Sequence, residues 1–266
     1  MAIRSPRPSP DPGPHSLAGP TDALQRRRHR FYRHLLAASF TLMATLVLPG
    51  RWSFLIFPGY LLLTAMVLVE LGGAVGGGDP RPADHFYRWL GAGTILILLY
   101  WLLAPSHVLH TGLLVVALVG PFYFWTLVRL VGWLAEEPRV SRQVLSGALA
   151  GYLLLGICGG LLLSAVESLD PGSFRSAFDG SDPMMRGGSF DPGSPLTLTW
   201  ERNFMRVNYF AFVSLTTVGY GDIIPVRPLA QMGSLLLSVA GPLYIAVVMG
   251  VLISRLTTSG ERRDQD

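Results

Sequence analysis

The sequence contains no lysine, so all 21 of its basic residues are arginine, and charged residues make up only 14% of its 266 positions. Soluble globular domains carry about a quarter charged residues, so this composition disfavours a soluble protein, and a chain that is half hydrophobic is not disordered either. Its one cysteine, Cys158, excludes a disulfide within the chain. Because the arginines lie between apolar runs and do not gather in one soluble segment, nucleic acid is not an expected partner.

Apolar runs of the length that crosses a bilayer, which takes about 20 residues, dominate the chain. Six spans are predicted, at about residues 31–48, 52–71, 87–103, 108–134, 144–166 and 229–255. The sequence therefore predicts an all-α, multi-pass membrane protein surrounded by lipid. No intramembrane nucleophile with a base and no cluster of ionisable residues is visible, so neither an enzyme nor a cofactor is expected.

The arginines also predict how the chain is oriented in the membrane. If the amino terminus is cytoplasmic, the inner segments hold 15 arginines and the outer segments hold six. The positive-inside rule then places both termini in the cytoplasm. Residues 1–30, with six prolines in the first twenty positions, are predicted to be a disordered tail, and residues 257–266 a short cytoplasmic tail.

A short apolar run and a glycine-bearing loop lie between the last two predicted spans. The run, 208–215, is too short to cross a bilayer but suits a re-entrant helix. The loop that follows reads TVGYG from Thr217 to Gly221. A potassium ion can exchange its water shell for rings of backbone carbonyls from four such loops. Successive carbonyls face one axis only if the backbone alternates in handedness, and Gly219 and Gly221 adopt that alternation without steric cost.

The predicted potassium sites consist of backbone carbonyls and one hydroxyl. The carbonyls belong to Thr217, Val218, Gly219 and Tyr220, the hydroxyl belongs to Thr217, and Gly221 completes the filter. The side chains of Val218 and Tyr220 are expected to pack outward and hold the ring open. Since one chain supplies one filter strand, four copies are needed, and the expected partner is the chain itself, as a homotetramer.

The TVGYG loop resembles the signature of tetrameric potassium channels, and the resemblance covers about Leu145 to Arg255. It implies a pore domain over residues 144–256, with an outer helix, a long turret, a pore helix, a filter and an inner helix. It also implies that Asp222 bonds an aromatic residue of the pore helix, here Tyr209. Tyr209, Thr216 and Asp222 are thus the predicted filter support, whereas Val213 stands where some members carry a glutamate.

The last predicted span carries a glycine and a proline at a place where this family often has a hinge. Gly241 follows Gly221 by twenty residues, and Pro242 removes the hydrogen bond to the carbonyl of Ser238. Gly241 and Pro242 therefore predict a gate hinge, with a fixed kink that does not move as the alternative.

Residues 31–134 are predicted to form a four-helix domain without the charges of a voltage sensor, followed by a cytoplasmic linker at 135–143. The span 108–134 holds one arginine, Arg129, and the only acidic residue expected near it is Glu70. A voltage sensor needs several charges, because each contributes only about 2.3 kcal/mol per 100 mV. The chain is similar in this respect to six-helix prokaryotic potassium channels whose first four helices lack gating charges.

Small residues in one predicted span and carboxylates in the outer segment also lead to predictions. Small residues along 144–166 are expected to pack closely against the span 229–255; they are Gly147, Gly151, Gly156, Cys158, Gly160 and Ala165. Carboxylates in and beside the outer segment 168–203, including Glu167 and Asp170, either raise the local cation concentration or form a solvated turret without effect.

These features predict a potassium-selective channel in an inner or plasma membrane, passing K⁺ passively with weak or no voltage dependence. Three alternatives stay open: a non-conducting receptor or scaffold, a voltage-gated channel with a degenerate sensor, and a subunit of a potassium uptake system. The last resembles four degenerate pore repeats in one chain, whereas this sequence has one repeat.

Overall fold

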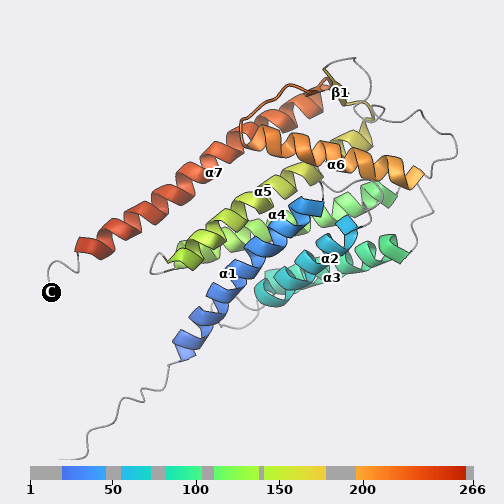
Figure 1. Ribbon diagram of the computed structural model, residues 1–266. Coiled ribbons are helices and arrows are strands. Elements are labelled where there is room, and N and C mark those ends of the chain that lie inside the picture. The colour runs from blue at the N-terminus through green and yellow to red at the C-terminus, as the bar shows by residue number, and fades with distance from the viewer. Residues whose placement is uncertain are drawn as a thin grey trace, which may run out of the picture.

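The computed structural model describes residues 20–45, 55–72, 82–103, 111–137, 141–177 and 196–261, which are almost entirely helical. The elements are α1 (Pro20–Thr45), α2 (Ile56–Leu71), α3 (Pro82–Leu103), α4 (Thr111–Glu136), α5 (Arg142–Leu169), β1 (Phe174–Ser176), α6 (Leu196–Leu215), β2 (Ile223–Pro225) and α7 (Pro228–Glu261) (Figure 1).

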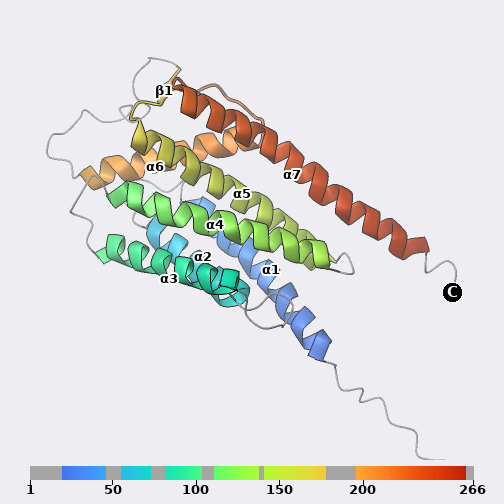
Figure 2. The ribbon, with the colours of Figure 1, turned by 180° about the vertical axis from the view of Figure 1, so that it is seen from behind.

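Helix α5 is the centre of the arrangement, because it contacts α1, α4, α6 and α7. Helices α2 and α3 pack against each other on one side of the bundle, and α7 lies at the opposite edge in both views (Figures 1 and 2). The glycines of α5 allow these close approaches, since a glycine lets a neighbouring helix come near the backbone.

The first four helices enclose a core rich in aromatic side chains. Tyr87 and Phe122 stack with ring centroids 5.1 Å apart, and Tyr60 meets Tyr123 edge to face at 5.7 Å. Two buried hydroxyls have partners: Tyr87 shares a hydrogen bond of 3.0 Å with Thr126, and the Tyr123 hydroxyl donates to the Tyr60 carbonyl at 3.1 Å. Paired polar groups of this kind remove the cost of burying them. The buried Tyr60 hydroxyl has no hydrogen-bond partner among the described residues.

Helix α1 begins at Pro20, so the chain differs from the predicted disordered tail over residues 20–30. Proline is well suited to a first helical position. The arginines near the predicted tail have partners: the Arg27 Nε lies 2.9 Å from Glu70, and the Arg28 guanidinium lies 4.7 Å from the centre of the Trp133 ring. At the other end, α7 includes 257–261, which were predicted to be tail. The predictions for 1–19 and 262–266 fall outside the described residues.

Three stretches of the described helices are long and apolar enough to cross a membrane: Val115–Glu136 in α4, Arg142–Leu169 in α5 and Pro228–Val248 in α7. Helix α2 is apolar but has 16 residues, fewer than the roughly 20 that a crossing takes. By length and composition, the described helices therefore support three of the six predicted spans.

The segment predicted to be a turret, residues 168–203, has regular structure at both of its described ends. Strand β1 pairs antiparallel with β2, matching Phe174 with Pro225, and α6 already begins at Leu196. Residues 178–195 lie outside the described part. The β1–β2 pair ties the end of α5 to the chain that follows the TVGYG loop.

Candidate functional site

The TVGYG loop leaves the carboxyl end of α6 with an alternating backbone. Thr217, Gly219 and Gly221 have φ angles of 58°, 57° and 73°, and the residues between them do not lie in this left-handed region. Glycine adopts positive φ freely, whereas a residue such as Thr217 does so at a cost of about 1–3 kcal/mol. Such strain persists only where surrounding contacts fix the conformation, so the loop is held in an alternating geometry.

Those contacts come from the last turn of α6. The Thr217 N–H donates to the Ser214 carbonyl at 3.0 Å, and the Val218 and Gly219 N–H groups donate to the Val213 carbonyl at 3.1 and 3.4 Å. The first three N–H groups of the loop thus point back toward α6. Within the described ranges, no hydrogen bond ends on the carbonyl oxygens of residues 217–220. These carbonyls are therefore available to a ligand.

The loop lies on the surface of the single chain. The side chains of Val218 and Tyr220 are 52% and 70% exposed, although both are large and apolar or aromatic. Within the described part of one chain, about half or more of the surface of each residue therefore stays uncovered.

Two of the predicted supporting residues meet beside the loop. The hydroxyl of Tyr209 on α6 lies beside the carboxylate of Asp222, and partial burial together with this neighbouring carboxylate raises the pKa of the Tyr209 hydroxyl. The Asp222 carbonyl accepts the Ala177 N–H at 3.0 Å, next to the β1–β2 pair. The loop is therefore tied to α6 on one side and to the outer segment on the other.

Thr216, the third predicted supporting residue, directly follows the end of α6, and Val213 lies in its last turn. Both residues take part in hydrogen bonds there. The Thr216 hydroxyl donates to the Phe212 carbonyl at 2.7 Å, which closes the last helical turn. Val213 is buried behind the loop and presents its carbonyl to two loop N–H groups. Its apolar side chain brings no carboxylate to this position.

Glu167 has a structural role that the sequence did not predict. It is buried at the end of α5, where its carboxylate accepts the N–H groups of Gly172 at 2.8 Å and Phe174 at 3.3 Å. Asp170, also predicted as a surface carboxylate, lies 3.6 Å from Arg227. Glu167 therefore shapes the turn into β1, and the Asp170 charge is partly offset. In the sequence, the signal for this contact is an acidic residue five positions before the glycine of a Pro-Gly turn.

The glycine predicted as a hinge lies in close contact with α6. A side chain at Gly241 would collide with the carbonyl oxygen of Leu215, the last residue of α6. Close packing thus accounts for glycine at this position without any movement. Pro242 is exposed within a continuous α7, and the upstream hydroxyls of Ser234 and Ser238 bond back to carbonyls one turn earlier, a pattern that often bends helices.

The small residues of α5 contact four neighbouring helices, not only α7 as predicted. Gly151 meets the Tyr244 hydroxyl of α7, whereas Gly156 meets the Phe212 ring of α6 and Gly160 meets the Asn208 amide of α6. Gly147 faces α1 and α4 instead, against Tyr32 and Leu134. Gly156 and Gly160 therefore allow α6, the helix that precedes the TVGYG loop, to pack closely against α5.

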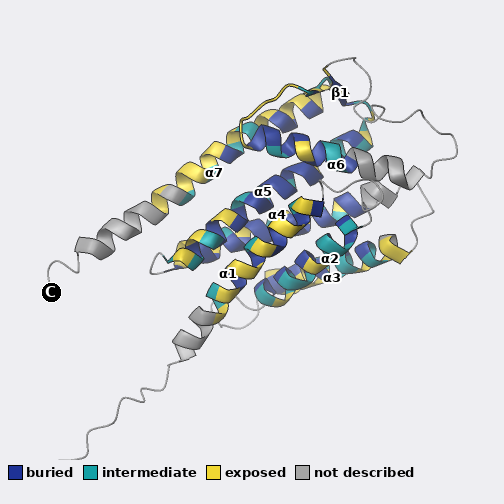
Figure 3. Cartoon of the chain, in the orientation of Figure 1, coloured by how far each residue is buried: buried dark blue, intermediate teal, exposed yellow. Residues whose placement is uncertain are grey.

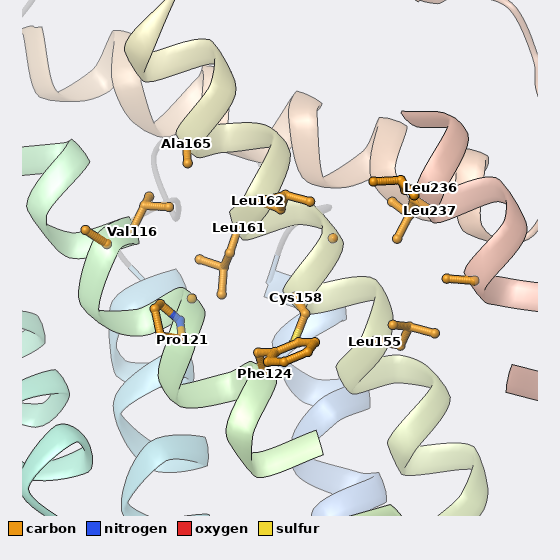
Figure 4. Close-up of a pocket in the computed structure, with 14 residues that line it drawn as sticks. Val116, Pro121, Phe124, Leu155, Cys158, Leu161, Leu162, Ala165, Leu236 and Leu237 are labelled. Carbon is orange, nitrogen blue, oxygen red and sulfur yellow. The ribbon is translucent and has the colours of Figure 1, made fainter. Parts of the chain in front are cut away.

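A cavity of about 590 Å³ opens between α4, α5 and α7, but its lining is unsuited to ions (Figure 4). Pro121, Phe124 and Leu161 are among its walls, and the single thiol of Cys158 is its only heteroatom-bearing side chain. An ion that enters it would lose its hydration without gaining oxygen ligands. In the described part of the chain, no group of three or more His, Cys, Asp and Glu residues could hold a metal ion.

Comparison with known families agrees with a candidate site at the TVGYG loop. Residues 192–258 match the family described as "Ion channel", which covers α6, the TVGYG loop and most of α7. No curated protein and no solved structure matches the chain. The family match supports an ion channel in a membrane rather than an enzyme. It covers less than half of the chain and does not identify the ion.

Proposed function

We propose that this protein is a potassium-selective channel that passes K⁺ passively through a ring of four TVGYG loops. The observation that carries the proposal is the alternation of positive φ angles at Thr217, Gly219 and Gly221, with the N–H groups of Thr217, Val218 and Gly219 bonded back to α6. This backbone leaves the carbonyls of Thr217, Val218, Gly219 and Tyr220, with the Thr217 hydroxyl, to replace the hydration shell of K⁺. No covalent step and no cofactor is involved.

The electrostatics of α6 favour a cation at the same place. The carboxyl end of a helix carries a partial negative charge from its aligned peptide dipoles. Helix α6 ends at Leu215, two residues before Thr217. Four such helix ends around one axis would stabilise an ion at the inner end of the filter.

The exposed surfaces support assembly as a homotetramer. One chain contributes one filter strand, and a ring of carbonyls needs four. Large apolar side chains are exposed along α7 as well as at the loop (Figure 3); those on α7 are Leu229, Met232, Leu235, Leu236, Val239, Leu243, Ile245, Val247 and Val251. In the proposed assembly, neighbouring copies cover Val218 and Tyr220, and copies or lipid cover the α7 face.

We also propose six membrane spans, with both termini in the cytoplasm of an inner or plasma membrane. Helices α4, α5 and α7 have the required length and hydropathy, and α1 to α3 would complete the bundle around them. Helix α6 would enter the membrane without crossing it, because its seat on Gly156 and Gly160 of α5 places it among other helices.

The buried ion pair of the first four helices supports weak or absent voltage dependence. An Arg129 nitrogen lies 2.8 Å from Asp84 on α3, with side chains 7% and 8% exposed, and the guanidinium lies 4.7 Å from the Tyr87 ring centre. Breaking a buried pair costs about 3–5 kcal/mol. A single charge that crosses a potential of 100 mV contributes only about 2.3 kcal/mol. Voltage is therefore too weak to displace Arg129, which also disfavours a voltage-gated channel with a degenerate sensor.

Flux into proteoliposomes tests the proposal against its alternatives. We expect K⁺-driven flux that Na⁺ cannot replace and that Ba²⁺ blocks. A sealed tetramer would support a receptor or scaffold, and flux that requires a partner protein would support an uptake subunit. Equal flux of K⁺ and Na⁺ would contradict the selective filter.

A further inference from the structure

The last four backbone carbonyls of α6 do not all accept hydrogen bonds from the same kind of group. A helix leaves its four final carbonyls without intrahelical bonds. In α6, the filter loop itself bonds three of them: the Phe212 carbonyl accepts the Thr216 N–H at 2.9 Å, and those of Val213 and Ser214 accept the N–H groups that follow. The fourth, the carbonyl of Leu215, receives no backbone N–H within the described part of the chain.

The Leu215 carbonyl is contacted from two other helices instead. The hydroxyl of Tyr152 on α5 donates to it at 3.4 Å, and the backbone of Gly241 on α7 lies so close that a side chain there would collide with it. Leu215 itself is fully buried. This peptide is thus fixed between α5 and α7, immediately before the two threonines that lead into the filter.

We propose that Tyr152 is a positioning residue for the filter, and that the Leu215 carbonyl is the contact through which α7 acts on the filter. The inference rests on the proposed function of the loop. Rotating the Leu215 peptide would turn the residues that follow it, and Thr217 is already held at a φ of 58°. The Tyr152 hydroxyl opposes this rotation on one side, and the Gly241 backbone opposes it on the other.

The position of α7 along α5 also affects the Leu215 peptide. The Tyr244 hydroxyl, one turn beyond Gly241, donates to the Ala148 carbonyl of α5 at 2.8 Å, and its ring centre lies 5.9 Å from that of Tyr152. A shift of α7 at this level therefore changes the contact between Gly241 and Leu215. On this account, the Gly241 region regulates the filter directly in addition to any bend of the helix below.

The experiment is Ba²⁺ block of the full-length tetramer in planar bilayers, together with the Rb⁺/K⁺ permeability ratio. Ba²⁺ is close to K⁺ in size and doubly charged, so its dissociation rate reports the geometry of the carbonyl sites. In Tyr152→Phe, the lost hydroxyl should change the dissociation rate about 2- to 10-fold, the factor that one hydrogen bond contributes. Tyr123→Phe is the matched control: it loses a hydroxyl–carbonyl bond, to Tyr60, within the first four helices and away from Leu215, and should leave both readouts unchanged.

A double-mutant cycle gives a second, independent test. If Gly241→Ala and Tyr152→Phe act on the same carbonyl, their effects on Ba²⁺ dissociation should be non-additive. Selective wild-type current with Tyr152→Phe equal to wild type, or equal to Tyr123→Phe, would overturn this inference and leave the proposed function standing. Wild-type current without K⁺ selectivity would overturn both. The thermal stability of each tetramer shows whether a changed block reflects the filter or a loosened fold.

Discussion

The first four helices and the unit formed by α5 to α7 differ in how their polar groups are paired and in how their apolar side chains are covered. In the first region, the charged pair Asp84–Arg129 and the Tyr87–Thr126 hydroxyl pair are satisfied inside one chain. In the second, a strained loop holds its N–H groups but leaves its carbonyls free, and α7 exposes a long apolar face. In the proposed assembly, ions and neighbouring copies of the chain would supply the partners that the second region lacks. Function is therefore expected to reside where the single chain is incomplete.

The largest effect is expected from the loop glycines. Gly219→Ala places a side chain at a φ of 57°, at a cost of about 1–3 kcal/mol in each of four chains. K⁺ efflux from proteoliposomes should fall by at least about 100-fold. The matched control is Gly132→Ala on α4, where a side chain meets open space and alanine favours the helix. Normal efflux in Gly219→Ala, or equal loss in both variants, would contradict the difference between the regions.

Next in size is the buried ion pair of the first region. Asp84→Asn leaves Arg129 without its charged partner, so the bundle should lose about 3–5 kcal/mol of stability, measured by thermal or denaturant unfolding in detergent. The K⁺/Na⁺ permeability ratio should stay unchanged, because the pair does not touch the loop. The double variant Asp84→Leu with Arg129→Met should regain most of the stability, since apolar packing can replace a buried pair. A changed permeability ratio in Asp84→Asn would show that the two regions are not separable.

A smaller effect is expected at the brace beside the loop. Tyr209→Phe removes the hydroxyl beside Asp222, and a hydrogen bond between the two would be worth about 1 kcal/mol. The tetramer should then require a few-fold higher K⁺ concentration to keep its filter conducting, as measured by the K⁺ dependence of current. Tyr209→Trp supplies an indole N–H in place of the hydroxyl and should restore much of the wild-type behaviour. If Phe and Trp at this position behave alike, the hydrogen bond is not what supports the filter.

The smallest effect is expected at the exposed pair of α1 and α2. Arg27→Gln breaks a surface bridge to Glu70, so stability should change by about 1 kcal/mol or less and the current should not change. A loss as large as that of Asp84→Asn would mean that the start of α1 matters more to the bundle than its exposure indicates. Melting temperatures of the two variants, recorded side by side, give this comparison.

The sequence predicted the loop better than its surroundings, for a physical reason. Carbonyl coordination requires glycines at fixed spacing, so Gly219 and Gly221 could be assigned to an alternating backbone before the fold was known. The start of α1 at Pro20 was missed because its arginines resemble a solvated tail until Glu70 and Trp133 are placed beside them. The local composition around residues 20–30 gives no sign of these partners, because they lie far away in the sequence.

Long-range partners account for the other differences. Arg129 was expected to have only Glu70 near it, yet its partner is Asp84, in the first turn of α3, which the sequence assigned to a loop. The three-residue strands β1 and β2 are too short to produce an alternating pattern. The contact of Gly241 with Leu215 could not be predicted either, because it depends on how α6 and α7 cross.

The most direct test of the central claim is the reversal potential of current through the purified protein in a planar bilayer, with K⁺ on one side and Na⁺ on the other. If backbone carbonyls of the TVGYG loop coordinate dehydrated K⁺, the reversal potential should follow the K⁺ gradient, and Ba²⁺ should abolish the current. A reversal potential near zero, with Na⁺ and K⁺ carrying equal current, would contradict the account.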